Sequence, residues 1–176
     1  SDPDRPIPPG STIGIMGSGQ LGRMTALAAA RLGYRCHVFS PEADSPAEHV
    51  ATATVAPYSD AAALARFAAD VDVVTFEFEN VPHDCVKLLS ERVWVRPRWE
   101  CLHISQDRLR EKKFMATIGV PTVAYEKVTS AEALVRAAAS LGRPAVLKTT
   151  RLGYDGKGQV MVGEDTNLQT AWAEMG

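Results

Sequence analysis

The stretch Ile15–Met24, IMGSGQLGRM, decides the fold expected for the first half of the chain. Gly17, Gly19 and Gly22 form a GxGxxG pattern directly after a short apolar run, and an alanine-rich helical pattern follows. This order of strand, glycine turn and helix is typical of a dinucleotide-binding unit. Backbone N–H groups and the positive end of the helix make such a turn attractive to anions.

The end of the second expected strand argues against a dinucleotide. A dinucleotide site needs an acidic residue there, about 20 residues beyond the glycine turn, to bind the ribose hydroxyls. This chain has Ser40, followed by Pro41 and Glu42. Two other interpretations stay open: a turn that holds a single phosphate or phosphosugar, and a purely structural turn whose glycines let the helix and strand pack closely.

Strands and helices alternate along the first hundred residues. Apolar runs predict strands at 11–16, 34–39, 50–55, 71–76 and 93–95, and helical patterns lie between them at 21–32, 61–69 and 81–89. The alternation predicts an α/β domain with a right-handed parallel sheet at 11–100. The proline-rich residues 1–10 are expected to be a flexible leader.

The second half, residues 101–176, has a different order of elements. Helices are expected at 105–118, 130–141 and 167–175, and strands at 122–128, 145–149 and 159–162. Ser130 is the expected N-cap of the middle helix, because its hydroxyl can accept a hydrogen bond from a free backbone N–H group.

Composition excludes several classes of function. The chain is 45% apolar and 23% charged, with a formal charge of −2 and no long run of like charge, which argues against nucleic acid as a partner. No apolar stretch approaches the roughly 20 residues that cross a bilayer. Three widely spaced cysteines and four histidines show no zinc or catalytic-triad spacing. These features predict a cytoplasmic protein with reduced thiols.

Two acidic residues lie in TFEFENVP, residues 75–82, at the end of a buried strand. Glu77 and Glu79 fall on the same side of that strand, whose carboxyl end reaches the ligand crevice of an open α/β sheet. Both are compatible with ordinary solvated acids, and this is the interpretation preferred for Glu79. Glu77 is closer to the buried run and is expected to bind a polar ligand.

A second glycine-rich stretch, LKTTRLGYDGKGQ, occupies residues 147–159. Lys148 follows an apolar run, so a hydrated ammonium group lies at the edge of a core and calls for an anionic partner. Its glycines allow close approach to phosphates, and Lys157 adds a mobile positive charge. A flexible hairpin with surface lysines is the alternative. The GxxxxGK[ST] pattern of a Walker loop is absent.

Taken together, GSGQLGRM, FEFENVP, QDRLREKKFMATIGVPT and LKTTRLGYDGKGQ resemble, in this order and spacing, the N-terminal half of the N5-carboxyaminoimidazole ribonucleotide synthetases. The resemblance covers about residues 11–163. It implies a Rossmann-like parallel-sheet pre-ATP-grasp domain at 11–100, followed at 101–176 by the first α/β subdomain of an ATP-grasp fold. It also implies that the glycine turn faces the ribonucleotide side of a cleft and holds no dinucleotide.

The resemblance implies a role for particular residues. The residues that match ATP-binding positions are Arg108, Lys148, Gly153, Gly156, Gly158 and Gln159. Those that match substrate-binding positions are Gly19, Gln20, Leu21 and Glu77. Catalytic roles near the ribonucleotide and bicarbonate fall to Tyr154, Asp155 and Lys157.

The implied activity is that of an ATP-grasp carbon–nitrogen ligase in purine biosynthesis. ATP phosphorylates bicarbonate to carboxyphosphate, and the carboxyl group passes to 5-aminoimidazole ribonucleotide, giving ADP and phosphate. The family's Mg²⁺ ligands are expected beyond this stretch, so no metal ligand is assigned here and the 176-residue chain alone is expected to be inactive. The resemblance leaves open whether the protein forms a homodimer.

Two other classes stay open. The first is another ATP-grasp ligase, of the formate-dependent glycinamide ribonucleotide transformylase or biotin carboxylase type. The second is a non-catalytic nucleotide-binding module.

Overall fold

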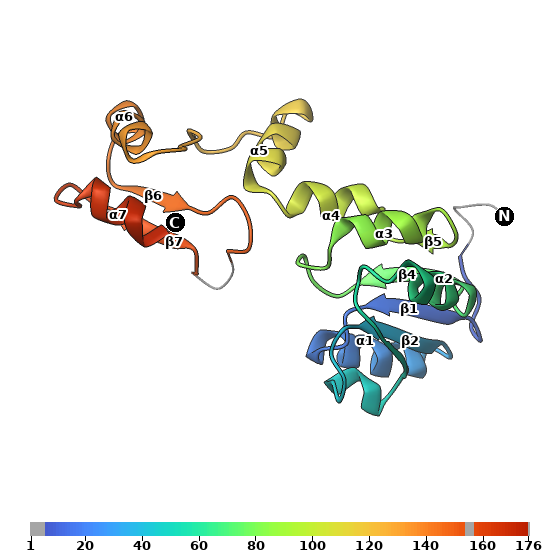
Figure 1. The fold of residues 1–176 in the computed structure, drawn as a ribbon. Coiled ribbons are helices and arrows are strands. Elements are labelled where there is room, and N and C mark those ends of the chain that lie inside the picture. The colour runs from blue at the N-terminus through green and yellow to red at the C-terminus, as the bar shows by residue number, and fades with distance from the viewer. Residues whose placement is uncertain (1–5, 154–156, 176) are drawn as a thin grey trace. The chain divides into compact units, whose positions relative to one another are not determined.

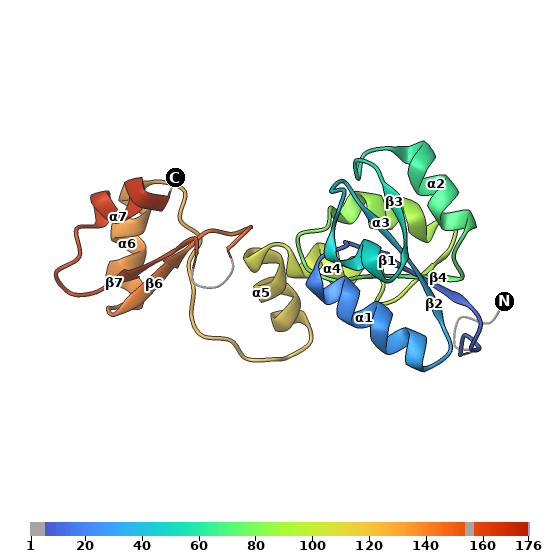
Figure 2. The same cartoon turned by 90° about the horizontal axis from the view of Figure 1, so that it is seen from below.

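The computed structural model describes residues 6–153 and 157–175. The chain divides into two compact units, Ser1–His103 and Ile104–Gly176. Figures 1 and 2 show that the first unit is built on a sheet with helices on both faces, and that the second has helices packed on a two-stranded hairpin.

The first unit contains a five-stranded, fully parallel sheet in the order β3-β2-β1-β4-β5. Its strands are β1 Thr12–Met16, β2 Arg35–Ser40, β3 Thr52–Val55, β4 Val73–Phe76 and β5 Trp94–Val95. The parallel α/β prediction is therefore confirmed. β1 lies at the centre, where the chain order reverses, and ligands of open α/β sheets bind beyond the carboxyl ends of the strands at such a point.

Successive residues of β1 point to opposite faces of the sheet. Ile15 packs with Val38 and Ala47 beneath α1. Met16 joins a larger cluster on the other face, which includes Phe67. Gly14 faces the same way, and a Cβ atom at this position would lie 2.8 Å from the ring of Phe67.

The helices of the first unit begin and end close to their predicted positions. They are α1 Gln20–Arg31, α2 Ala61–Ala69, α3 His83–Ser90 and α4 Trp99–Ser105, with a short 3₁₀ helix, η1, at Pro46–His49. Asp60 caps α2, because its carboxylate accepts a hydrogen bond from the N–H of Ala63 at 2.9 Å. The sequence patterns missed η1 and α4. A capping box formed by Ser45 and Glu48 begins η1.

The second unit consists of α5 Arg108–Thr117, α6 Ala131–Leu141, α7 Leu168–Met175 and an antiparallel hairpin of β6 Ala145–Lys148 and β7 Gln159–Val162. Its core joins α6 and α7 to the hairpin through a small apolar cluster. The buried members are Leu134, Ala138, Leu147, Val162 and Leu168. Ser130 caps α6 as predicted, because its hydroxyl accepts from the N–H of Ala133 at 3.1 Å.

Two predictions for the second unit need correction. Residues 122–128 form no strand, because no strand of the described chain pairs with them; Val123 is 79% exposed. The helix predicted at 105–118 begins at Arg108, because the side chain of Asp107 accepts hydrogen bonds from the N–H groups of Leu109 and Arg110 and so caps α5 there.

Part of the predicted leader is anchored to the first unit. The hydroxyl of Tyr34 donates to the carbonyl of Ile7 at 2.7 Å, and the N–H of Gly10 donates to the carbonyl of Gly33 at 2.7 Å. Among the described residues, no helix combines the length and the apolar character needed to cross a membrane.

Candidate functional site

The glycine turn before α1 encloses the carboxylate of Glu77. Glu77 directly follows β4, and its N–H donates to the carbonyl of Met16 at 3.1 Å, so the parallel pairing of β1 and β4 brings it beside the turn. Oε1 of Glu77 accepts from the N–H of Gly19 at 2.9 Å, and Oε2 accepts from the N–H of Gly22. The anion at this turn is thus a side chain of the same unit.

The glycines are needed because the carboxylate leaves no room for a side chain. A Cβ atom at Gly17 would lie 2.6 Å from Cδ of Glu77, and one at Gly22 would lie 2.6 Å from Oε2. Gly17 also has a φ of +106°, which glycine adopts readily. Helix α1 has no side-chain cap at Gly19 and no acidic residue in its first turn, so Glu77 supplies both from elsewhere in the sequence.

At the end of the neighbouring strand, β2, the polar side chain also has a hydrogen-bond partner within the first unit. Ser40, at the position where a dinucleotide site would have an acid, is buried, and its hydroxyl accepts a hydrogen bond from the N–H of Glu42 at 3.0 Å. A recess of about 460 Å³ adjoins the turn and is lined by Leu21, Thr75 and Glu77 among others. Gln20 and Leu21 are both exposed, and Leu21 is one of the lining residues.

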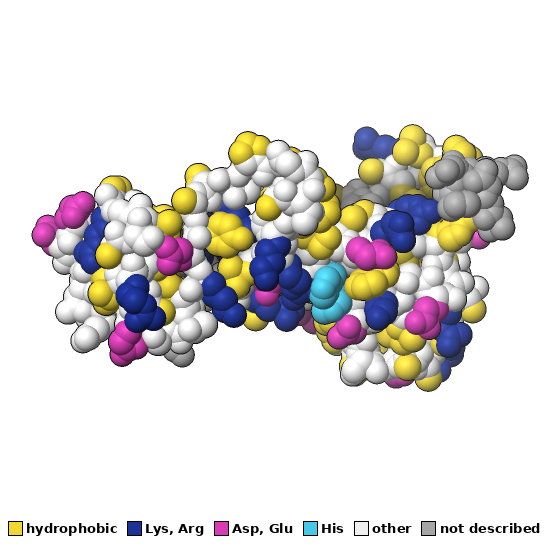
Figure 3. Space-filling model, turned by 90° about the horizontal axis from the view of Figure 1, so that it is seen from above, with side chains coloured by type: hydrophobic (Ala, Val, Ile, Leu, Met, Phe, Trp, Pro, Cys, Tyr) yellow, Lys and Arg dark blue, Asp and Glu magenta, His cyan; other side chains and the backbone are white. Residues whose placement is uncertain are grey.

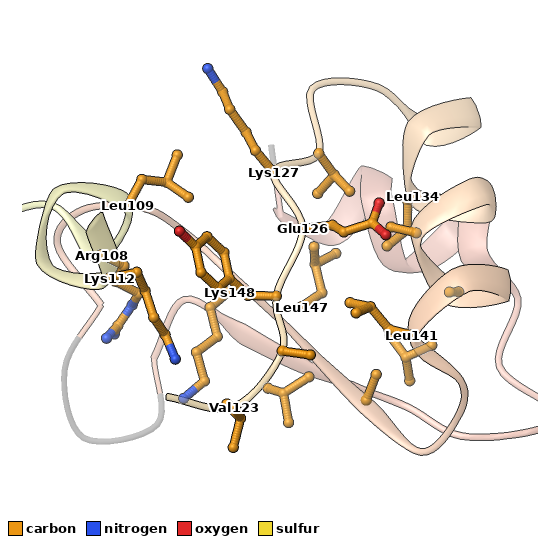
Figure 4. A pocket seen from close by; sticks show the side chains of 18 of the residues that line it. Arg108, Leu109, Lys112, Val123, Glu126, Lys127, Leu134, Leu141, Leu147 and Lys148 are labelled. Atoms are coloured by element: carbon orange, nitrogen blue, oxygen red, sulfur yellow. The ribbon is translucent and has the colours of Figure 1, made fainter. Parts of the chain in front are cut away.

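The second unit contains a cavity of about 470 Å³ with a cationic end and an apolar wall (Figure 4). Arg108 and Lys112 reach it from α5, and Lys148 reaches it from the end of β6. Apolar side chains line the rest, including Leu134 and Leu147. Such a combination suits a ligand with a planar apolar part and an anionic part.

Arg108 holds the chain that leaves β6. Its Nε donates to the carbonyl of Thr149 at 3.1 Å, its Nη2 donates to the carbonyl of Gly153 at 3.1 Å, and its backbone N–H donates to the carbonyl of Thr150 at 2.9 Å. This guanidinium, predicted to contact ATP, therefore anchors the chain from Thr149 to Gly153.

Lysines supply the other cationic groups of the cavity. Lys148 is exposed, and no carboxylate of the described residues forms an ion pair with it, so its charge is available to an anionic ligand. Lys112 lies with its Nζ 5.5 Å from the centre of the Tyr125 ring. The sequence patterns missed Lys112, although it lies four residues after Arg108 and hence on the same helix face.

The glycine-rich loop is described at both ends. The predicted residues Tyr154, Asp155 and Gly156 lie outside the described part. Gly158 has a φ of +66°, and its carbonyl accepts from the N–H of Thr149 at 2.9 Å. Lys157 is exposed and Gln159 begins β7. The structure thus brings Arg108, Lys148, Gly153 and Gly158 to the same end of the hairpin.

Among residues 6–153 and 157–175, no three histidine, cysteine or acidic side chains gather into a metal-binding group. On the face shown in Figure 3, acidic side chains lie among the basic ones.

Comparison with protein families identifies both units. The family described as the ribonucleotide synthetase pre-ATP-grasp domain matches residues 11–106. The chain belongs to this family. The ATP-grasp domain family matches residues 113–176. The predicted pre-ATP-grasp and ATP-grasp architecture is therefore confirmed.

Relatives of known name extend the match across nearly the whole chain. N5-carboxyaminoimidazole ribonucleotide synthase of Brucella melitensis is 48% identical over 170 residues, which are 95% of this chain and 47% of the relative. The Pseudomonas aeruginosa synthase is 45% identical over 93% of this chain and 46% of its own length. This chain therefore spans about half the length of these synthases.

Solved structures agree with the sequence matches. A synthetase crystallised as its ADP complex is 42% identical, with a TM-score of 0.90 over 97% of this chain and 45% of that one. The Thermus thermophilus synthetase is 39% identical, with a TM-score of 0.83 over 93% of this chain and 44% of that one.

Proposed function

We propose that this chain provides the pre-ATP-grasp unit and the first ATP-grasp subdomain of an N5-carboxyaminoimidazole ribonucleotide synthase. The match to synthases across 95% of the chain at 48% identity carries the proposal. The cationic cavity of the second unit supports it independently, because it suits a nucleotide. The enzyme works in the cytoplasm, in purine biosynthesis, on small-molecule substrates, as a monomer or a homodimer.

ATP occupies the cavity of the second unit. Its apolar wall receives the adenine, and Lys148 and Lys112 attract the phosphates. Arg108 holds the chain from Thr149 to Gly153, so that backbone N–H groups at Gly153 and Gly158 reach the phosphate oxygens, while Gln159 fixes the start of β7. Gly156, which lies outside the described residues, is also assigned to ATP binding. A solved relative that is 42% identical was crystallised with ADP.

The ribonucleotide lies beside the glycine turn of the first unit, against Gly19, Gln20 and Leu21. The carboxylate of Glu77 accepts two N–H groups of the turn, yet two carboxylate oxygens offer about four acceptor sites. The remaining sites accept hydroxyl groups of the substrate. Tyr154, Asp155 and Lys157 serve the reacting groups.

The reaction transfers the γ-phosphoryl group of ATP to bicarbonate and then the carboxyl group of carboxyphosphate to the exocyclic amine of 5-aminoimidazole ribonucleotide. ADP and phosphate are released. Phosphoryl transfer depends mainly on positioning and on stabilisation of negative charge, which the lysines and loop N–H groups supply.

Mg²⁺ is the metal that such a reaction requires. The described residues contain no group of three metal-binding side chains that fits it. No residue of this chain is therefore assigned to the metal.

The test joins this chain to the complementary half of the Brucella melitensis synthase and follows labelled bicarbonate into acid-trapped product. We expect ATP-dependent incorporation that requires 5-aminoimidazole ribonucleotide, and none from the 176-residue chain alone. A Lys148→Ala chimera should lose most of the rate, whereas Arg136→Ala, an exposed cation of α6, is the matched control. A folded, ATP-binding chimera that used formate and ignored bicarbonate would contradict the proposal.

A further inference from the structure

We infer that Glu77 makes the glycine turn of the first unit reject phosphate and pyrophosphate groups. The inference rests on the geometry of the turn and not on the proposed carboxylation. It assigns to Glu77 a role in specificity: the protein's own carboxylate occupies the place where a dinucleotide-binding turn receives a phosphate.

The turn has the properties of an anion site. Its glycines expose backbone N–H groups at the N-terminus of α1, where the helix dipole favours negative charge. In dinucleotide-binding turns the pyrophosphate takes these N–H groups. Here the N–H groups of Gly19 and Gly22 donate to Oε1 and Oε2 of Glu77 instead.

The side chain of Glu77 also occupies the space at the turn, in addition to accepting hydrogen bonds from its N–H groups. The side chain of Glu77 lies against all three glycines, since a Cβ atom at Gly17, Gly19 or Gly22 would come within 3.2 Å of it. A phosphate at this turn would have to displace a carboxylate or lie beside it. Like charges a few ångströms apart repel strongly where water is partly excluded.

The GxGxxG pattern accommodates a side chain of the protein itself. The glycines allow close approach of a group to the backbone, and the group that approaches is Glu77, which lies 55 to 60 residues further along the chain. The missing acid at Ser40 fits this account, because a turn closed to pyrophosphate has no use for a residue that binds the adjoining ribose.

The experiment titrates the ¹⁵N-labelled chain with inorganic pyrophosphate and follows the amide resonances of Gly17, Gly19 and Gly22. In the wild-type chain these resonances should not move, even where pyrophosphate binds the second unit. In Glu77→Ala they should shift and saturate, with affinity at the turn at least about tenfold higher than in the wild-type chain.

Glu79→Ala is the matched control, because it removes the same charge two residues away and leaves the turn closed. If Glu77→Ala loses its fold, Glu77→Ser carries the same prediction, because it too removes both the charge and most of the side-chain volume from the turn. Saturable movement of the turn resonances in the wild-type chain would overturn the inference. A folded Glu77 variant in which pyrophosphate leaves the turn unchanged would also overturn it.

Discussion

Gly22 is a position in helix α1 where an added side chain would collide with Glu77. Alanine favours a helix over glycine by about 1 kcal/mol, so Gly22→Ala would stabilise an ordinary helix. Here the new Cβ atom would lie 2.6 Å from Oε2 of Glu77, and we expect a loss of about 1–3 kcal/mol instead. Urea unfolding followed by circular dichroism measures the change.

The control for that substitution is Thr25→Ala, an exposed position on the same helix, where the change should stay within about 0.5 kcal/mol. A Gly22→Ala protein more stable than the wild type would show that the carboxylate does not occupy the turn.

The three cysteines should differ in reactivity, because their burial differs. All three are free thiols. Burial raises the pKa of Cys85 to about 12, and it also raises the pKa of the half-buried Cys36. Because the thiolate is the reactive form, iodoacetamide at pH 8 should modify exposed Cys101 first and Cys85 last, as mass spectrometry would show. Native Cys85 reacting as fast as Cys101 would contradict this packing, and Cys101→Ser should remove the fast phase.

Sequence reasoning reached single residues unevenly. Lys148 was predicted at a ligand site because it follows an apolar run, and it lines the cavity of the second unit. Glu77 could be placed at the edge of the sheet but not against Gly22, since no local pattern reports a contact across 55 residues. Lys112 was missed because a charged helix such as α5 looks like any solvated helix until Tyr125 is seen beside it.

Among the helices and strands, the start of α5 should respond to acid. Burial by itself would raise the pKa of Asp107, but the N–H groups of Arg110 and Leu109 and the charges of Arg110 and Arg151 outweigh it and lower this pKa. The ionised carboxylate therefore favours the folded state. Its contribution is complete above the unfolded pKa of about 3.9 and is lost as the pH falls through the lower, folded value.

We therefore expect amide exchange at Leu109 and Arg110 to accelerate, beyond the intrinsic pH effect, below about pH 4. Asp107→Asn keeps an acceptor at the cap without the charge and should remove this additional acceleration, whereas Glu111→Gln on the same helix should not. Equal acid sensitivity in the wild type and Asp107→Asn would exclude Asp107 as the cause.

Elements with their own local signals were predictable, and those that depend on partners were not. The cap at Ser130 and the buried strands of the parallel sheet follow from short patterns. The extended stretch at 122–128 has the composition of a strand, yet a strand exists only where another pairs with it. Helix α4 begins two residues after Pro97 and has no strong start signal.

For the whole molecule, the central claim is a division of work between the two units. The first unit has the glycine pattern of a nucleotide-binding fold, but its own Glu77 takes the anion position. The second unit lacks a Walker loop, yet it gathers Lys112 and Lys148 around a cavity of about 470 Å³. A nucleotide should therefore bind to the second unit alone.

The most direct test of this claim is a residue-resolved NMR titration of the chain with ATP. We expect saturable shifts at Lys112, Lys148 and Thr149, unchanged resonances at Gly19 and Gly22, and loss of the shifts in Lys148→Ala. Shifts confined to the glycine turn, with β6 unmoved, would contradict it.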